Sequence, residues 1–312
     1  MSADPFANVL ILTGPTGCGK TRLSVELAER LGAEIISMDS MALYRRMDVG
    51  TAKPGPGERR RVPHHLLDVL EPWESASVAW WLARAAACVR DIEARGRRAL
   101  LVGGTALYLK AVLHGLFDGP PADDAVRARL TEEAERHGRA ALHARLAAVD
   151  PAGAARLHPN DLRRVIRALE VWELTGRPIS AWQTQWQGQK AKAKSQKSKR
   201  EKRCLCIVLP RGELYSRINL RVERMIESGF VEEVRALWQL PRPLSREASQ
   251  ALGYREMRDH LEGKTSLPET IARIQQRTRN FAKRQLAWFR HLPDCQFCDK
   301  QLTFESRDLT IM

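Results

Sequence analysis

Cysteine is scarce in this sequence, which has six cysteines among 312 residues. Secreted domains held together by disulfides are much richer in cysteine, so this class is excluded. Long uncharged apolar runs are also absent, because no stretch approaches the roughly 18 residues that a membrane-spanning helix needs. The first residues lack the basic start of a signal peptide. We therefore expect a cytoplasmic protein with reduced thiols and no membrane segment.

Acidic residues are too few to balance the basic ones. The sequence has 37 Asp and Glu against 51 Lys and Arg, which gives a formal net charge of +14. This excess predicts either a polyanionic partner or an uneven distribution of charge. Hydrophobic residues make up 44% of the chain, which is enough for a sizeable core and excludes disorder of the whole chain.

Half of this excess charge lies in one short segment, residues 187–203, which has eight basic residues and one glutamate for a net charge of +7. The segment has no apolar face, so we expect a solvated flexible linker. It could contact RNA or only aid solubility, and composition favours the second interpretation. Basic residues also occur in 162–167 and, among aromatic residues, in 273–290. Such faces suit phosphates and stacked bases, although an amphipathic core helix is the alternative.

Short apolar strands alternate with helical segments in the first third of the chain. We predict strands at 8–13, 33–38 and 98–102 and helices at 20–31 and 77–95. This alternation is typical of a doubly wound parallel sheet, so the predicted fold class is α/β with a P-loop NTPase-like sheet flanked by helices.

The remaining segments predict four regions. Residues 1–121 form the first part of the P-loop core, and the helical periodicity of 122–186 indicates an all-helical insertion. The polybasic linker 187–203 follows. Residues 204–312 complete the core with a strand at 204–209 and end in a helical C-terminal region.

A phosphate-binding loop follows the first predicted strand. The stretch GPTGCGKT fits the pattern G-x-x-x-x-G-K-[ST] between a strand and a helix. Its backbone N–H groups can surround a diphosphate, its lysine can reach the phosphate oxygens, and its last hydroxyl can bind Mg²⁺. The residues of this loop are Gly14, Pro15, Thr16, Gly17, Cys18, Gly19, Lys20 and Thr21.

Polar residues follow the next two predicted strands. Asp39 comes directly after the second strand, and Gly103, Gly104 and Thr105 come after the third. In a doubly wound sheet, ligands bind at this edge. Asp39 can act as a general base or bind metal there. The alternatives are an N-cap for Asp39 and an ordinary turn for the glycines.

Seven stretches, in order along nearly the whole chain, resemble the tRNA dimethylallyltransferase family, also called tRNA isopentenyltransferases. They are GPTGCGKT (14–21), DSMALYRRMDVGTAKP (39–54), PHHLLDV (63–69), LVGGTALYLKA (101–111), HPNDLRRVIRALEV (158–171), LGYREM (252–257) and TRNFAKRQLAWFR (278–290).

The resemblance implies transfer of a dimethylallyl group from dimethylallyl diphosphate to N6 of the adenosine immediately 3′ of the anticodon, position 37, with release of diphosphate. The P-loop then holds an isoprenoid diphosphate, and Mg²⁺ is the implied cofactor. Asp39 matches the base that takes a proton from the adenine amine. Thr105 and Arg127 match groups at the diphosphate and the target nucleotide. Together with Lys20 and Thr21, they complete the implied catalytic set.

The resemblance also implies an RNA surface, since the target base must leave its stack to enter a pocket. The insertion is then a tRNA-binding domain. A solvated helix face is the alternative for the arginines of 163–167. The implied tRNA-binding residues are Asp39, Ser40, Met41, Ala42, Thr105, Arg127, Arg163, Arg164, Val165, Ile166, Arg167, Gln250, Ala251, Leu252, Gly253, Tyr254, Arg255, Thr278, Arg279, Lys283, Arg284 and Gln285.

Two other functions stay open. One is prenyl transfer to free AMP, ADP or ATP, which would not need the basic surfaces of the insertion and the C-terminal helix. The other is a P-loop nucleotide kinase or NTPase, for which a second acidic strand is missing. We expect a monomer. We also expect His64 and His65 to be structural or loop contacts and Cys204-x-Cys206 to lie in a core strand. We do not assign a metal site to Cys295-x-x-Cys298, which is half of a zinc pattern.

Overall fold

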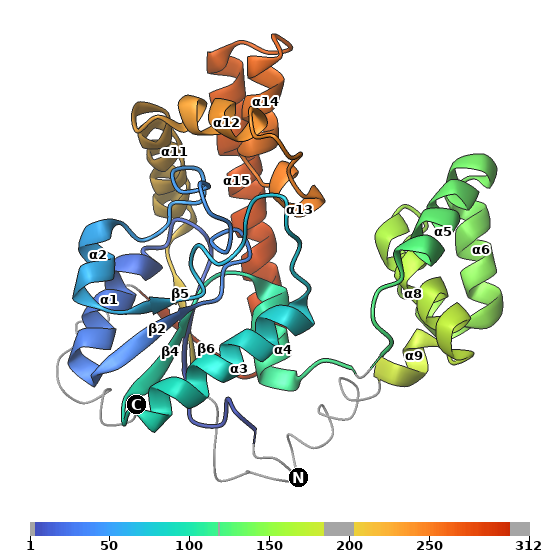
Figure 1. The fold of residues 1–312 in the computed structure, drawn as a ribbon, viewed down its shortest axis with the longest axis horizontal. Coiled ribbons are helices and arrows are strands. Elements are labelled where there is room, and N and C mark those ends of the chain that lie inside the picture. The colour runs from blue at the N-terminus through green and yellow to red at the C-terminus, as the bar shows by residue number, and fades with distance from the viewer. Residues whose placement is uncertain (1–3, 118, 184–202, 300–312) are drawn as a thin grey trace. The chain divides into compact units, whose positions relative to one another are not determined.

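The computed structural model describes residues 4–117, 119–183 and 203–299 (Figure 1). The chain divides into two compact units, residues 1–113 with 200–312 and residues 114–199, and we describe each by itself. The predicted boundaries at residues 122 and 186 stay predictions, and residues 187–202 of the predicted linker lie outside the described ranges. In the part of the chain that is described, no helix is long and apolar enough to cross a membrane.

A six-stranded parallel sheet forms the centre of the first unit, in the order β3-β2-β4-β1-β5-β6. In its middle, Leu10 pairs with Leu100 on one side and with Arg203 on the other. The predicted α/β class with a parallel sheet is confirmed. The strands are β1 (Leu10–Thr13), β2 (Ala33–Ser37), β3 (His64–His65), β4 (Arg98–Val102), β5 (Arg203–Val208) and β6 (Cys295–Asp299).

The two edge strands, β3 and β6, are not indicated by the sequence pattern. His64 and His65 pair with Ile35 and Ile36 of β2. Cys295 pairs with Cys204, and their sulfur atoms lie 3.1 Å apart. No group of three or more metal-binding side chains occurs among the residues that the structure describes.

Both faces of the sheet are buried, as is typical of parallel strands. Successive residues of β1 belong to different hydrophobic clusters, because side chains alternate between the two faces. Ile11 packs with Trp81 of α3 (Val78–Ala94) and Leu109 of α4 (Ala106–His114). Leu12 packs with Val25 of α1 (Lys20–Leu31) on the other face. These clusters hold the strands whose carboxyl ends carry the candidate site.

The remaining helices of the first unit cover the sheet or extend beyond it (Figure 1). The longest, α15, begins with a capping box in which Ser266 accepts a hydrogen bond from the N–H of Glu269. It contributes Ala282 to one hydrophobic cluster and Phe289 to the other. These helices are α2 (Pro56–Arg61), α11 (Arg211–Glu227), α12 (Phe230–Trp238), α13 (Arg246–Ser249), α14 (Tyr254–Leu261) and α15 (Leu267–Arg290).

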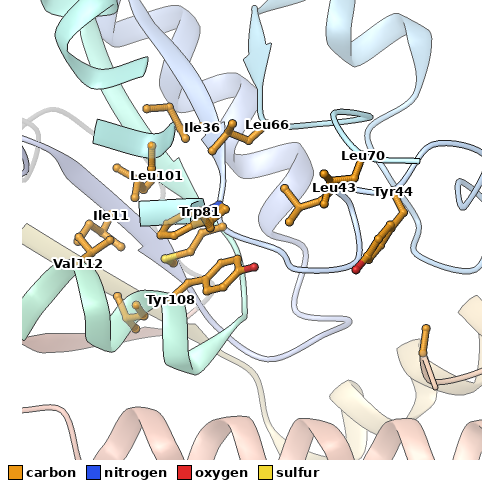
Figure 2. Close-up of a cluster of buried hydrophobic side chains, with 14 of the residues drawn as sticks. Ile11, Ile36, Leu43, Tyr44, Leu66, Leu70, Trp81, Leu101, Tyr108 and Val112 are labelled. Carbon is orange, nitrogen blue, oxygen red and sulfur yellow. The ribbon is translucent and has the colours of Figure 1, made fainter. Parts of the chain in front are cut away.

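An aromatic pair lies under the end of β2. The rings of Trp81 and Tyr108 stack with centroids 4.2 Å apart, and Figure 2 shows them among the apolar side chains of the strands. The indole N–H of Trp81 donates to the carbonyl of Ser37 over 3.1 Å. This contact holds the last residue of β2, two positions before Asp39.

The second unit is helical within its described residues. Its core includes Leu130, Leu146, Val165 and Leu169, which are fully or almost fully buried. The helical periodicity predicted for this region is confirmed there. The helices are α5 (Asp124–His137), α6 (Arg139–Val149), α7 (Pro151–Ala154), α8 (Leu162–Thr175) and α9 (Ile179–Trp182).

Candidate active site at the carboxyl ends of the strands

The loop between β1 and α1 has the backbone shape that its glycines permit. Gly14, Gly17 and Gly19 have φ values of 148°, 82° and 93°. A Cβ atom on Gly14 would lie 2.6 Å from the carbonyl oxygen of Ile207 on β5, so the close passage of the two backbones requires glycine. This geometry leaves the start of α1 open to an anion, which the helix dipole attracts.

Lys20 folds back over this loop. Its Nζ atom donates to the carbonyl oxygens of Gly14, at 3.0 Å, and Pro15, at 2.8 Å. Both partners are neutral carbonyl groups. The ammonium group is therefore held at the phosphate-binding loop by neutral groups.

Asp39 and Thr105 lie at adjacent strand ends and are linked through Ser40. The N–H of Ser40 donates to Oγ1 of Thr105 over 3.0 Å. Asp39 Oδ1 accepts from the N–H of Met41 over 2.9 Å, which leaves its other carboxylate oxygen for a ligand. Gly103 is required beside them, because a Cβ there would lie 2.1 Å from the carbonyl oxygen of Met38. The structure thus brings together two residues that the sequence predicted for the site.

Gln285 connects the phosphate loop with the Gly103-Gly104 turn. Its Oε1 accepts from the N–H of Thr16 at 2.9 Å, and its Nε2 donates to the carbonyl of Gly104 at 2.7 Å. The side chain is only 5% exposed. Gln285 was expected at the RNA surface, but both ends of its amide are used inside the protein. Its position supports the two loops.

Arg221 of α11 is a site residue that no sequence motif indicates. It donates to the hydroxyl of Thr16 at 3.2 Å and to the carbonyl of Thr51 at 3.3 Å. Desolvation lowers its pKa, and the negative charge of Asp39 opposes this shift. A guanidinium keeps its proton in proteins, so Arg221 brings a second cation to the loop. The sequence signal that could have identified it is its place on the apolar side of α11, between Ile218 and Val222.

A cavity of about 80 Å³ lies between the start of α1, the ends of β2 and β4 and the segment 51–54. Its lining combines Lys20, Thr21 and Asp39 with apolar residues. The polar lining residues are Lys20, Thr21, Ser24, Ser37, Asp39, Thr51, Lys53 and His64; the others are Ile35, Ala42, Ala52, Pro54, Leu67, Val102 and Gly103. Such a lining suits a small molecule with one charged and one hydrocarbon end.

His64 gives this wall a neutral imidazole. Its Nδ1 donates to the carbonyl of Val62 at 2.8 Å, and burial lowers the pKa of the ring. Its Nε2 is buried and has no hydrogen-bond partner in the described part of the chain. The free nitrogen is therefore an acceptor beside the cavity.

In the second unit, a buried carboxylate holds two of the predicted arginines. Glu170 is 0% exposed and accepts from Arg127, at 2.9 Å, and from Arg167, at 2.6 Å. Burial alone would raise the pKa of Glu170, but the hydrogen bonds from the arginines and from the N–H of Asp123 hold the pKa below its usual value. Both arginines have fixed positions within their unit.

The predicted RNA-binding residues differ in exposure. The buried members cannot present their side chains to RNA, and they are Ala42, Val165, Ile166, Ala251, Gly253, Tyr254 and Gln285. The exposed members are Arg163, Arg164, Gln250, Arg255, Lys283 and Arg284. Half-buried members are Asp39, Ser40, Met41, Thr105, Arg127, Arg167, Leu252, Thr278 and Arg279.

Comparison with protein families gives two matches. The model described as IPP transferase matches residues 42–292, and the model described as isopentenyl transferase matches residues 7–68. Together they cover both the phosphate loop and the helical insertion.

Individual proteins are similar over most of their length. A tRNA dimethylallyltransferase of Geobacter metallireducens is 45% identical, over 100% of this chain and 99% of its own. One of Symbiobacterium thermophilum is 50% identical, over 90% of this chain and 86% of its own.

Solved structures also match. The tRNA isopentenylpyrophosphate transferase of Bacillus halodurans has a TM-score of 0.67 and 39% identity, covering 98% of this chain and 93% of its own. A eukaryotic dimethylallyltransferase acting on tRNA has a TM-score of 0.73 and 28% identity, covering 93% of this chain and 73% of its own.

Proposed function

This chain belongs to the IPP transferase family, and from that membership we propose how its residues carry out the reaction. The enzyme transfers a dimethylallyl group to A37 of tRNA. The acceptor atom is N6 of the adenine, the donor is dimethylallyl diphosphate, and diphosphate is released. The single observation that carries the assignment of residues is the shared cavity of Lys20, Thr21 and Asp39.

The diphosphate of the donor binds at the phosphate loop. The loop N–H groups and the start of α1 surround the phosphate oxygens, and Lys20 and Arg221 supply two positive charges. Such groups oppose the negative charge that grows on diphosphate as it leaves. The hydrocarbon group lies against the apolar wall that includes Ala42 and Leu67.

The oxygen donors of the cavity fit Mg²⁺, which prefers oxygen ligands and usually binds together with substrate phosphates. The Thr21 hydroxyl would hold the ion, because it lines the cavity at the first turn of α1. When bound, Mg²⁺ supplies further charge stabilisation for the leaving diphosphate.

Asp39 takes the proton from the exocyclic amine of adenine as the new C–N bond forms. Its carboxylate lines the cavity, and one of its oxygens is held by the N–H of Met41. An exocyclic amine is a weak nucleophile, so a positioned base accelerates its attack. Thr105 keeps the Asp39–Ser40 backbone in place.

Exposed cations bind the RNA. Arg163 and Arg164 on α8 and Lys283 and Arg284 on α15 are exposed, and each group suits phosphates. The guanidinium of Arg284 also lies 5.9 Å from the ring of Phe281, which is 38% exposed and available for stacking. Arg127 is assigned to substrate binding by its match to the family alone.

One assay tests this function. The protein is incubated with Mg²⁺ and radiolabelled dimethylallyl diphosphate in the presence of unmodified tRNA, AMP or ATP. We expect label in tRNA alone. Label in AMP but not in tRNA would support an adenylate isopentenyltransferase, and ATP hydrolysis without prenyl transfer would support a P-loop NTPase.

We also propose a monomer in the cytoplasm, where tRNA is found. The cysteines of the described ranges are free, as a reducing compartment favours. Light scattering during size exclusion should give the mass of one chain, 35.3 kDa.

A further inference from the structure

We propose that Glu233 of α12 is a positioning residue for the donor cavity, although it does not line the cavity. It fixes the loop Asp48–Gly50, which continues directly into one wall of that cavity. The inference rests on the proposed function of the cavity as the site of dimethylallyl diphosphate.

Glu233 binds three successive backbone N–H groups. Its Oε2 accepts from Asp48 at 2.8 Å and from Val49 at 2.7 Å, and its Oε1 accepts from Gly50 at 3.1 Å. The loop has neither helix nor strand partners for these N–H groups, so the carboxylate replaces them. Hydrogen bonds to a charged acceptor are about twice as strong as neutral ones. One side chain therefore determines the path of three residues.

The carboxylate is itself held in place. The hydroxyl of Tyr254 donates to Oε1 of Glu233 at 2.7 Å, and Tyr254 is completely buried. Its ring packs edge-on against Phe230, with centroids 5.1 Å apart. A Cβ on Gly50 would lie 2.3 Å from Phe230 and 2.6 Å from Tyr254, so the loop passes in direct contact with both rings. The loop has little freedom to adopt another position.

The restrained loop leads straight to the cavity. The four residues after Gly50 all line it, and they are Thr51, Ala52, Lys53 and Pro54. Ala52 has a φ of 48°, a conformation that a non-glycine residue adopts only when its surroundings enforce it. The carbonyl of Thr51 accepts from Arg221, which also contacts the phosphate loop. A shift of the loop thus moves both the wall and a cation of the donor site.

The test compares Glu233→Gln with Tyr254→Phe and with Glu232→Gln, a control at an exposed neighbour on the same helix. A glutamine would place an N–H₂ group against the loop N–H donors, so Glu233→Gln should raise KM for dimethylallyl diphosphate about tenfold, with KM for tRNA unchanged. Tyr254→Phe should raise the donor KM roughly threefold, because only the contact that orients the carboxylate is lost. The control should match the unmodified enzyme.

A loss of kcat with an unchanged donor KM in Glu233→Gln would show a smaller folded fraction and overturn the inference. If that variant does not fold, Tyr254→Phe decides by the same measurement. Lys20→Met separates the two proposals: if it leaves the donor KM unchanged, the donor assignment fails. If it raises the donor KM and the Glu233 and Tyr254 variants do not, only the role of Glu233 fails.

Discussion

The two units hold their functional cations in different ways. Lys20 and Arg221 in the first unit contact carbonyl and hydroxyl oxygens. Arg127 and Arg167 in the second unit share the buried carboxylate of Glu170. Lys20 and Arg221 are thus held by neutral oxygens, although the carboxylate of Asp39 lies in the same site, whereas Arg127 and Arg167 are held by a carboxylate.

This difference indicates different uses of charge. A cation held by neutral oxygens is ready for a strongly charged ligand such as diphosphate. An arginine paired with a carboxylate gives up part of its attraction but gains a fixed position and retains N–H groups for directed hydrogen bonds. Variants that remove a cation of the first unit or the carboxylate of the second unit test this difference.

Removing the charge of Lys20 should have the largest effect. Lys20→Met takes a cation from the leaving diphosphate, and we expect kcat/KM for prenyl transfer to fall roughly a thousandfold. Single-turnover transfer of labelled dimethylallyl groups to tRNA measures this. Arg22→Met is the matched control, because its side chain is 81% exposed on the same helix. A loss of less than tenfold would show that Lys20 is not needed for charge stabilisation.

Neutralising Asp39, the proposed base in the same cavity as Lys20, should have the next largest effect. Asp39→Asn keeps the shape of the side chain but cannot accept the adenine proton, so turnover should fall on the order of a hundredfold. A gel-shift titration should show unchanged binding of tRNA. Asp124→Asn, at an exposed position of α5, serves as the control. Unchanged turnover would contradict the role of Asp39.

Removing the buried carboxylate of the second unit should lower the stability of the fold more than the rate of prenyl transfer. Glu170→Gln leaves Arg127 and Arg167 without a counterion, and we expect the free energy of unfolding to fall by about 3 kcal/mol. Urea denaturation at pH 7 and hydrogen exchange in α5 and α8 measure this loss. Equal hydrogen-exchange protection in the unmodified protein and in Glu170→Gln would show that the positions of the arginines do not depend on Glu170.

The ion pairs of Glu170 with Arg127 and Arg167 predict that the stability of the fold depends on pH. Because the folded protein holds the pKa of Glu170 below its usual value of 4.5, the carboxylate stabilises the fold above that value. This contribution is lost as the pH falls through the lowered pKa. The difference in unfolding midpoint between the unmodified protein and Glu170→Gln should therefore be full at pH 7 and shrink below pH 4.5. A difference that is constant with pH would exclude the ion pair as its cause.

An exposed arginine of the second unit should give the smallest effect. Arg164 has only a 3.4 Å contact with Asp161, so Arg164→Ala should weaken tRNA binding a few-fold and reduce the salt-dependence slope by about 1. Binding titrations at several salt concentrations measure the slope. An unaltered slope would mean that Arg164 is a solvated surface residue.

Local patterns predicted the parts of the site that are continuous in sequence. The phosphate loop, Asp39 and the Gly103-Gly104-Thr105 turn each follow an apolar strand, and parallel strands bring such ends to one edge. The same patterns do not indicate β3, which has two residues, or β6, which follows the last helix. Short edge strands lack a periodicity long enough to distinguish them from loops.

The RNA surface shows a second limit of sequence reasoning. Residues 163–167 match as one continuous stretch, yet Val165 and Ile166 lie in the core while Arg163 and Arg164 are exposed. A helix turns every 3.6 residues, so consecutive residues cannot all face a ligand. Burial, which depends on what packs against α8, selects the usable positions.

By itself, the sequence determined the phosphate loop, the class of fold and, through its seven matching stretches, the family. Those features are local, because they depend on glycines, a lysine and alternating apolar runs close together in the chain. Only the tertiary structure placed Arg221, Gln285 and Glu233 against the loops of the site, since each contacts a loop about 170 to 270 residues away. Such contacts depend on packing of α11, α12 and α15 near the sheet, which no short pattern specifies.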